Sequence, residues 1–295
     1  MYSNIFVTLS DIMKKKIDIN LYVYGNAAQN PDCAQGAVVL KNALEKSDLA
    51  SHCNFHAPLT VHNPQQKQAA IKDVVILTTQ LAHSTQHAML EKKFFITLGG
   101  DNTASIGSWS GTAENNIGLI WFDAHMDAHT FETTPSNNIH GMPLAVLLGY
   151  GDKKLTDVVT TKLNPHNVVL VGIRSYESGE AALLKKLGVK IFYMHDIKKQ
   201  GIKKIMQDAV SIVTRDTTGF GIVIDLDFFD PLDAPGVGTP EQEGVRSNEF
   251  LPEFNMIAHH PQLMGADIVE FNPVLDVADK TKKLALELVR ILASE

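Results

Sequence analysis

The sequence of 295 residues is 44% hydrophobic and 20% charged, which is ordinary for a soluble globular protein. Its formal net charge of -7 leaves no basic footprint, and it has no apolar run of about 18 residues, so we expect neither nucleic-acid binding nor a membrane span. Its start lacks a signal-peptide-like apolar run, and Cys33 and Cys53 are expected to be reduced thiols rather than a disulfide, so we expect a cytoplasmic protein.

Residues 1–16 are ambiguous and could form a short strand or a helix that caps the body. Elsewhere, short apolar runs bounded by turn residues predict strands, and apolar residues with helical spacing predict helices. The predicted strands cover residues 17–25, 55–61, 94–98, 117–122, 167–173, 190–194, 219–225 and 263–271. The predicted helices cover residues 35–49, 63–92, 140–149, 179–187, 197–215, 247–260 and 278–294.

Strands alternate with helices along the chain, and most of the predicted strands are continuous apolar runs. This pattern indicates an α/β fold: a three-layer αβα sandwich with a mainly parallel sheet. No linker rich in Pro, Gly or Ser divides the sequence, so we predict a single domain over residues 1–295. Ligands bind such sheets at the carboxyl ends of the strands, where the unusual polar residues of this sequence fall.

A polar cluster follows the predicted strand at residues 117–122. Side chains of an extended chain alternate between two faces, so Asp123, His125 and Asp127 are expected to share one face. Two carboxylates and an imidazole in one place favour a divalent metal, because a cation offsets their repulsion and desolvation. The alternative is an ordinary polar edge between strand and loop.

A second cluster lies at the end of the predicted strand at residues 219–225. Asp225 and Asp227 share a face there, whereas Asp230 precedes Pro231 and is expected to have a structural role in a turn. The two clusters together offer more ligands than one tetrahedral zinc site needs, so two adjacent metals fit better. Carboxylate-rich ligation suits Mn²⁺ more than Zn²⁺, and a two-metal site would hold a bridging hydroxide as the nucleophile.

Five motifs occur in one order: GGDN (residues 99–102), DAHMD (123–127), SNNIHG (136–141), DLDFFDP (225–231) and DIVEFNP (267–273). Together they resemble the arginase/agmatinase (ureohydrolase) family, and bacterial-type arginases most, from about residue 24 to the end. The resemblance implies a three-layer α/β domain that hydrolyses a guanidino group with a dimanganese cluster and a metal-bridging hydroxide. The reaction that it most directly implies converts L-arginine and water to L-ornithine and urea.

The resemblance also implies a set of metal ligands. By motif position, Asp123 and Asp225 look like the carboxylates that bridge two metals. His125 and Asp227 would complete one metal, and Asp127 would complete the other.

The catalytic groups follow in the same way. His140 resembles the proton-shuttling histidine of the family, and Glu270 resembles the carboxylate that pairs with the guanidinium of the substrate. The leaving amine would take a proton that is carried by Asp227 or His140. Considered alone, His140 could be an ordinary histidine at a helix start and Glu270 an edge salt bridge.

The substrate residues are implied by two loops. Thr134, Ser136 and Asn138 resemble the arginase loop that binds the α-carboxylate, and Glu177 stands where an acidic residue meets the α-ammonium. This combination favours L-arginine over agmatine, which has no carboxylate. His129 stands where arginases commonly have a neutral amide, and this departure weakens the assignment of the substrate.

Asn102 departs from the family pattern, in which a histidine ligand of the more exposed metal follows Gly-Gly-Asp. A carboxamide oxygen is a weaker ligand, so we expect that metal to be loosely held. His129, further along the alternation from Asp123, could approach it if the chain stays extended. Two other functions stay open: a ureohydrolase acting on agmatine or another guanidino compound, and a metal-depleted pseudoenzyme that serves assembly or binding. The resemblance implies a small guanidino substrate and a homotrimer or homohexamer.

Overall fold

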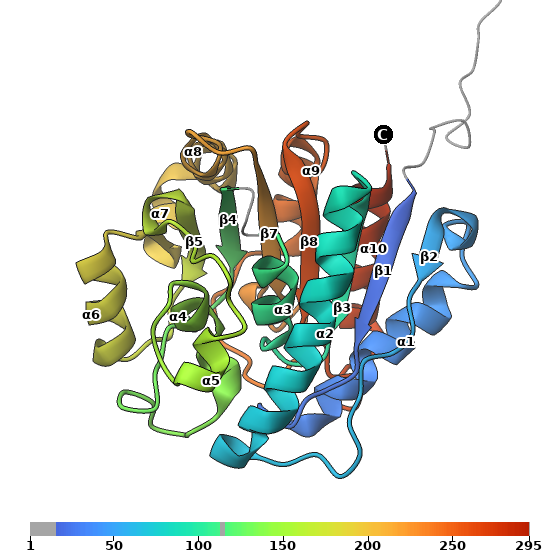
Figure 1. The fold of residues 1–295 in the computed structure, drawn as a ribbon. Coiled ribbons are helices and arrows are strands. Elements are labelled where there is room, and N and C mark those ends of the chain that lie inside the picture. The colour runs from blue at the N-terminus through green and yellow to red at the C-terminus, as the bar shows by residue number, and fades with distance from the viewer. Residues whose placement is uncertain (1–15, 113–115, 295) are drawn as a thin grey trace, which may run out of the picture.

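The computed structural model describes residues 16–112 and 116–294, so the element expected within residues 1–15 lies outside the described part. Its centre is one eight-stranded sheet in which every pairing is parallel (Figure 1). The strands are β1 (Ile17–Tyr22), β2 (Cys53–Phe55), β3 (Phe94–Gly99), β4 (Ile117–Phe122), β5 (Val168–Ile173), β6 (Lys190–Tyr193), β7 (Gly219–Asp225) and β8 (Leu263–Val269). Their order across the sheet is β2-β1-β3-β8-β7-β4-β5-β6.

Helices cover both faces of this sheet, which confirms the predicted three-layer α/β fold (Figure 1). One face is covered by α1 (Ala34–Leu44), α7 (Met194–Gln200), α8 (Ile202–Val213), α9 (Ser247–Ala258) and α10 (Lys280–Ala293). The other face is covered by α2 (Ile71–Leu90), α3 (Ala104–Ser110), α4 (Pro143–Leu147), α5 (Lys153–Thr156) and α6 (Ser178–Leu187). Short 3-10 turns include η2 (Pro31–Cys33), η3 (Ala50–His52), η4 (Lys67–Ala70), η6 (Ile139–Gly141), η7 (Pro165–Asn167) and η8 (Leu226–Phe228).

The apolar residues form two clusters, one on each side of the sheet. Alternate residues of a strand enter opposite clusters: Ile120 and Phe122 of β4 face α8 and α9, whereas Leu119 and Trp121 face the α2–α3 side. All six residues of β4 are buried. A central strand covered on both faces has no position for a solvent-exposed side chain, and this explains the continuous apolar runs in the sequence.

Four central strands, β3, β8, β7 and β4, are consecutive neighbours in the sheet and run in the same direction. Their carboxyl ends therefore form one continuous edge. The motifs that follow these strands in sequence, although up to about 170 residues apart, meet at that edge, because parallel strands present all their carboxyl ends on the same side.

Two predicted helices differ from the structure near their starts or middles. The helix expected over residues 63–92 begins only at Ile71, because Asn63 and Lys67 both have φ of 52°, in the left-handed region that a helix start does not contain. The helix expected over residues 197–215 is two helices, α7 and α8, because Gly201 between them has φ 82° and ψ 146°.

Other differences concern short elements. The helix expected over residues 140–149 is η6 followed by α4, which starts at Pro143. The strand expected at residues 55–61 is β2, after which Leu59 forms an isolated bridge to Tyr22. α3 was not predicted, because its seven residues are all buried and it has no exposed face to give a helical period in the sequence.

Within the described residues, no helix combines the length and the apolar character that crossing a membrane requires. Cys33 and Cys53 are both free thiols, as expected.

The contact between β7 and α3 leads to a prediction about stability. A Cβ placed on Gly221 would lie 1.9 Å from the indole ring of Trp109, which is fully buried. We expect Gly221→Ala to lower the free energy of unfolding by about 1–3 kcal/mol, because the ring has no free space to move into. Urea denaturation in the presence of a chelator measures the change. Gly238→Ala is the control, since its nearest neighbour would lie at 3.5 Å; equal midpoints for both variants would contradict this account.

Candidate metal centre and adjoining pocket

The edge formed by β3, β8, β7 and β4 brings the polar motifs together. Asp123 and His125 follow β4, and Asp225 is the last residue of β7. Asn102 comes shortly after β3, and Glu270 directly follows β8. Asp123, Asp225, Asn102 and Glu270 are all at most 2% exposed, so this is a buried polar layer rather than a solvated edge.

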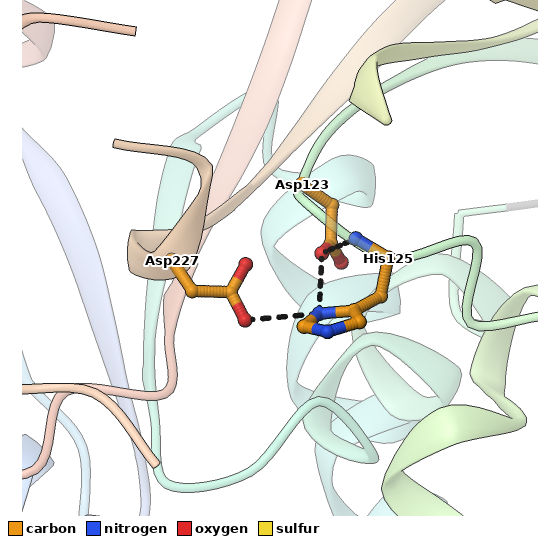
Figure 2. Close-up of side chains that lie close together, drawn as sticks. All are labelled: Asp123, His125 and Asp227. Carbon is orange, nitrogen blue, oxygen red and sulfur yellow. Dashed lines mark hydrogen bonds and ion pairs between the residues drawn. The ribbon is translucent and has the colours of Figure 1, made fainter. Parts of the chain in front are cut away.

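The tightest group in this layer consists of Asp123, His125 and Asp227 (Figure 2). One ligand atom from each lies within 4.8 Å of the others. His125 Nδ1 is 3.1 Å from Asp227 Oδ2 and 3.5 Å from Asp123 Oδ1. One imidazole nitrogen and two carboxylates are a suitable donor set for a divalent first-row metal.

Neighbouring donors hold these ligands in place. The indole N–H of Trp121 donates to Asp123 Oδ2 at 2.8 Å, and the Thr239 hydroxyl donates to Asp227 Oδ2 at 3.0 Å. The backbone N–H of Ala124 donates to Asp227 Oδ1 at 3.1 Å. Hydrogen bonds of this kind orient ligands before a metal binds. The roles of Thr239 and Trp121 were not predictable from the sequence, because a residue that donates to a metal ligand has no motif of its own.

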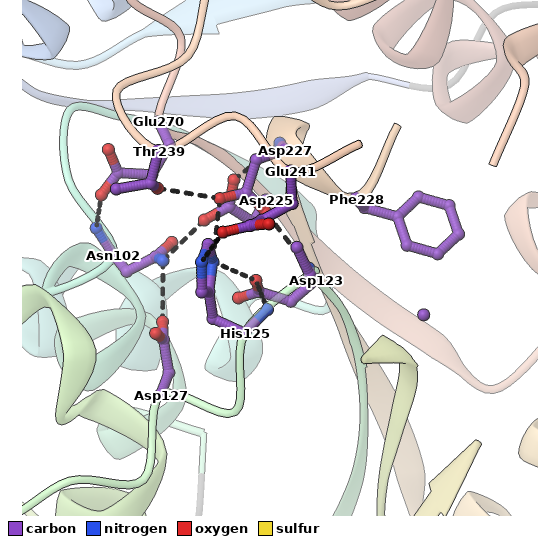
Figure 3. A network of polar contacts seen from close by, with 12 residues as sticks. Asn102, Asp123, His125, Asp127, Asp225, Asp227, Phe228, Thr239, Glu241 and Glu270 are labelled. Atoms are coloured by element: carbon purple, nitrogen blue, oxygen red, sulfur yellow. Dashed lines mark hydrogen bonds and ion pairs between the residues drawn. The ribbon is translucent and has the colours of Figure 1, made fainter. Parts of the chain in front are cut away.

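Asp127 and Asp225 are not members of that three-residue group, and Asn102 joins them (Figure 3). The Asn102 side-chain Nδ2 donates to Asp127 Oδ2 and to Asp225 Oδ2, both at 2.7 Å. Asn102 Oδ1 is buried without a hydrogen-bond partner. Asp127 has φ 48°, so the extended alternation that starts at Asp123 does not continue through it. The amide N–H₂ thus occupies the space between two carboxylates where a second cation was expected.

The crowding changes the acidity of these groups. Burial, reinforced by the charge of Asp227, raises the pKa of Asp123 to about 7. Burial and the neighbouring carboxylates also raise the pKa values of Asp127 and Asp225 well above the ordinary range. Burial alone would raise the pKa of Asp227 as well, but the facing His125 outweighs it and lowers this pKa to about 2. Together, the carboxylates lack positive charge, which a bound metal would supply.

The two groups of residues therefore differ in how well they fit a metal ion. Asp123, His125 and Asp227 are ready to hold one divalent ion. A second ion between Asp127 and Asp225 would have to displace the Asn102 N–H₂ group. Rotation of the amide would turn the unpartnered Oδ1 toward that ion, so the chain has a weak neutral ligand available for it.

The expected catalytic pair is also in contact. His140 Nδ1 lies 3.1 Å from Glu270 Oε1, which also accepts the backbone N–H of Asn102 at 3.1 Å. Burial lowers the pKa of His140, but the adjacent Glu270 outweighs it and raises this pKa overall. Glu270 has φ 64° and is 2% exposed, so its carboxylate is held in one position.

A cavity of about 260 Å³ opens above this layer. Its lining includes Asn102, His125, Asp127, His129, Ser136, Asn138, His140, Glu177, Glu180, Asp225 and Thr239. Of the residues expected to bind substrate, Thr134 does not line the cavity. Its hydroxyl instead accepts the backbone N–H groups of Ser136 and Asn137 at 3.3 and 3.2 Å, so it shapes the loop that carries Ser136.

One wall of the cavity holds a second polar group. His129 Nε2 lies 2.8 Å from Glu177 Oε2 and 3.6 Å from Glu180 Oε1. Glu180 also accepts the backbone N–H of Ala128 at 3.2 Å and that of Glu177 at 3.1 Å. The sequence analysis assigned no role to Glu180; its spacing of three from Glu177 at a helix start was the available signal.

Two further residues near the metal ligands were missed. Arg174, just after β5, donates hydrogen bonds to five backbone carbonyl oxygens, those of Gly172, Asp227, Phe228, Glu241 and Gln242. These bonds connect the end of β5 to the loop that follows β7 and to residues 241–242. Glu241 Oε1 lies 3.7 Å from His125 Nε2, on the side of the ring away from Asp227. A carboxylate in that place favours the tautomer whose Nδ1 is free to bind a metal.

A larger hollow of about 560 Å³ lies at the opposite edge of the sheet, beside the starts of β3 and β8. Among the described residues, its lining contains Lys92, Lys93, His259 and His260 and no carboxylate side chain. The smaller cavity is therefore the candidate site, because histidines and carboxylates gather together in its lining.

The raised pKa of Asp123 predicts how stability depends on pH when no metal is bound. A carboxyl whose pKa is 3.8 in the unfolded chain and about 7 in the folded chain is protonated more in the folded state between these values. The free energy of unfolding of chelator-treated protein should therefore fall, by an amount on the order of several kcal/mol, as pH rises from 5 to 8.

Asp127 and Asp225 act in the same direction, whereas the contribution of Asp227 changes only below about pH 4. Urea denaturation across this pH range measures the effect. Protein saturated with Mn²⁺ is the control and should gain stability over the same range, because metal binding requires ionised carboxylates. Metal-free stability that is constant or rises with pH would contradict the prediction.

The model of the arginase family matches residues 23–294. The arginase of Bacillus subtilis is 41% identical over 277 residues, which cover 91% of this chain and 93% of that one. The arginase of Brevibacillus brevis is 40% identical over 74% of this chain and 75% of its own. A crystal structure of Bacillus subtilis arginase superposes with a TM-score of 0.88 over 95% of this chain and 99% of that one, at 34% identity. The match to the family model and these relatives, over a chain that folds alike, establish that this protein belongs to the arginase family.

Proposed function

We propose that this protein hydrolyses L-arginine to L-ornithine and urea at a Mn²⁺ centre formed by Asp123, His125 and Asp227, with a second, weaker site beside Asn102. The observation that carries the proposal is the meeting of this metal-ligand group with the Glu270–His140 pair at the edge of one cavity. The matching relatives are named arginases, which favours this reaction over agmatine hydrolysis and over a role without catalysis.

Glu270 is the proposed partner of the substrate guanidinium. Its carboxylate is buried, fixed by two donors and able to accept two parallel N–H bonds from a planar guanidinium. Glu270 and Asp225 both contact Asn102, so a guanidinium held by Glu270 would lie beside the carboxylates of the proposed metal sites. Binding also excludes water from around Glu270, and this strengthens the attraction between the two charges.

His140 is the proposed proton carrier. It is in contact with Glu270 and lines the cavity, so a proton on its ring can reach the amine that leaves the guanidinium carbon. Asp227, which contacts both His125 and Thr239, is the second proposed carrier on the metal side. When bound, a divalent metal supplies Lewis acidity and lowers the pKa of water, so that a hydroxide nucleophile is available near neutral pH.

The other end of the cavity is proposed to bind the α-carbon groups of the substrate. Ser136 and Asn138 offer neutral donors for the carboxylate, and Thr134 holds their loop. Glu177, with a side chain that is 57% exposed, is the proposed acceptor for the ammonium. His129 is proposed to contact the carboxylate of the substrate, because its ring stands beside Glu177 and faces the cavity.

We further propose that the chain is a single domain, since all eight strands belong to one sheet. We also propose a homotrimer or homohexamer, which the resemblance to the family supports, and a cytoplasmic location, which the free thiols of Cys33 and Cys53 support.

The proposed reaction is tested by urea release. With Mn²⁺ in excess, L-arginine should yield urea and L-ornithine, and agmatine should react at least about 100-fold more slowly in kcat/KM, because it lacks the carboxylate for Ser136 and Asn138. Glu270→Gln should lower kcat/KM for L-arginine by about 100-fold or more, since a neutral amide cannot pair with the guanidinium.

Lys153→Gln is the control variant. Within the described part of the chain, Lys153 pairs with the exposed Asp157 and lies outside the cavity lining, so the activity of this variant should match that of the parent chain. Absence of urea at saturating Mn²⁺ would refute the proposal, as would faster hydrolysis of agmatine.

The weak second metal is tested at Asn102. We expect the parent chain to retain about one Mn²⁺ after desalting and Asn102→His to retain about two, because imidazole is the stronger ligand and does not donate N–H₂ to both carboxylates. Elemental analysis gives the metal count, and the Mn²⁺ concentration for half-maximal urea release should fall at least about 10-fold.

Asn102→Leu is the matched control, similar in size but without donor or ligand atoms. It should lose stability in chelator, because Asp127 and Asp225 then lose their shared donor, and it should not gain a metal. If Asn102→His binds no more Mn²⁺ than the parent, our account of this position is wrong.

A further inference from the structure

We propose that His129, Glu177 and Glu180 form an additional cation site on the cavity wall, suited to a late first-row divalent ion such as Zn²⁺ and separate from the centre at Asp123. His129 Nε2 and one oxygen from each glutamate lie within 4.8 Å of one another. Ligand atoms bound to one zinc ion at about 2.0–2.2 Å are separated by similar distances, so an ion fits between them with small side-chain movements.

The orientation of the imidazole supports this site. His129 Nδ1 lies 3.1 Å from the hydroxyl of Thr133, which also accepts the backbone N–H of Thr130 at 3.0 Å and lies 3.4 Å from the Thr130 carbonyl oxygen, to which it donates. With its own proton directed at that carbonyl, the hydroxyl accepts from Nδ1. Nε2 then faces Glu177 and Glu180, and an ion bound there would replace the proton through which Nε2 contacts Glu177 at 2.8 Å.

The charge around the site also requires a cation. Glu180 is 3% exposed and Glu177 is the outer, half-exposed ligand. Neither glutamate has an ion pair with Lys or Arg among the residues that the structure describes; His129 is the only basic partner of both. The group faces a cavity of about 260 Å³, so water can complete the coordination.

The three ligands come from two segments that are already held together. Glu180, in the first turn of α6, accepts the backbone N–H of Ala128, directly before His129, so the distance between the loop and the helix is fixed without a metal. A site whose ligands are held in place loses little conformational entropy when the ion binds. Imidazole and carboxylate ligands of either group bind Zn²⁺ with higher intrinsic affinity than Mn²⁺, so Zn²⁺ is the sensitive probe for this site.

This site has a consequence that rests on the proposed function, whereas the site itself does not. An ion bound to Glu177 would occupy the carboxylate that we propose for the substrate ammonium. It would therefore act as a competitive inhibitor, raising KM for L-arginine without a matching loss of kcat. The neutral amide that arginases commonly have at the position of His129 would not provide the imidazole ligand, so we expect no such inhibition with an amide there.

The site is tested by locating the metal. Crystals of Mn²⁺-loaded protein soaked in Zn²⁺ should show zinc anomalous scattering about 2.0–2.2 Å from His129 Nε2 and from both glutamates. In solution, elemental analysis after dialysis against Zn²⁺ should give one more divalent ion per chain for the parent than for His129→Asn or Glu177→Gln. The exposed side chain of Glu177 makes the second variant safe for folding.

His56→Asn is the matched control. His56 Nε2 lies 3.6 Å from Asp18, so this variant also removes an imidazole beside a carboxylate, but outside the cavity lining. It should keep the parent metal count. Equal counts for the parent and His129→Asn, or no anomalous peak at His129, would overturn the inference.

The two proposals fail separately. If zinc binds at His129 but L-arginine yields no urea, the cation site stands and the proposed reaction fails. If urea forms but the metal counts are equal, only the cation site fails. The competition between Zn²⁺ and substrate is tested with Mn²⁺ in constant excess. Added Zn²⁺ should raise KM for L-arginine at least about 10-fold in the parent chain and less than about 2-fold in Glu177→Gln, each relative to its own zinc-free value. Equal increases in both proteins would show that Zn²⁺ does not compete at Glu177.

Discussion

Negative charge buried at the carboxyl ends of four parallel strands is the constraint on which this site depends. Asp123, Asp225 and Asp227 are each at most 1% exposed, yet burial of an ionised carboxylate is unfavourable unless a cation or several donors accompany it. His125, Trp121 and Thr239 supply part of that compensation. The pKa of Asp123, raised to about 7, shows that the compensation is incomplete without a metal.

Asn102 supplies a different kind of compensation. One amide N–H₂ donates to two carboxylates at 2.7 Å, and this lowers the cost of burying Asp127 and Asp225 without any ion. The same contact opposes a second metal, which must first displace it. Metal-free stability and affinity for the second metal are therefore opposed at this position, and the buried, unpartnered Oδ1 is the group through which the balance can reverse.

Sequence periodicity predicted the features that depend on local patterns. Continuous apolar runs such as Ile117–Phe122 identified buried strands, and Asp123 and Asp225 were placed at strand ends because each directly follows or ends such a run. The order of the strands was not predictable in this way, because the neighbours β3 and β8 are separated by more than 160 residues. Elements without an exposed face, such as α3, were missed for a related reason: burial on all sides removes the periodic signal.

In the candidate site, too, local sequence patterns were predictive and tertiary contacts were not. The identity of the motif residues was readable, but the contacts between them were not. Alternation placed Asp127 beside Asp123, whereas its φ of 48° turns it toward Asn102. Thr239, Glu241 and Arg174 act through single contacts with residues far away in the sequence, and no local pattern encodes such contacts. The departures Asn102 and His129 were visible as residue types, but their partners became apparent only in the fold.

Both ends of the cavity repeat one arrangement, a glutamate facing a histidine. Glu270 pairs with His140 at 3.1 Å, and Glu177 pairs with His129 at 2.8 Å. Each glutamate is thus already in contact with an imidazole. A substrate with a cationic group at each end would have to displace each imidazole or bind the same carboxylate beside it. The ends differ in burial: the Glu270 side chain is 2% exposed, and that of Glu177 is 57% exposed. Coulomb attraction is stronger where water is absent, so Glu270 should dominate affinity, whereas Glu177 and its zinc-compatible neighbours should decide which cations reach it.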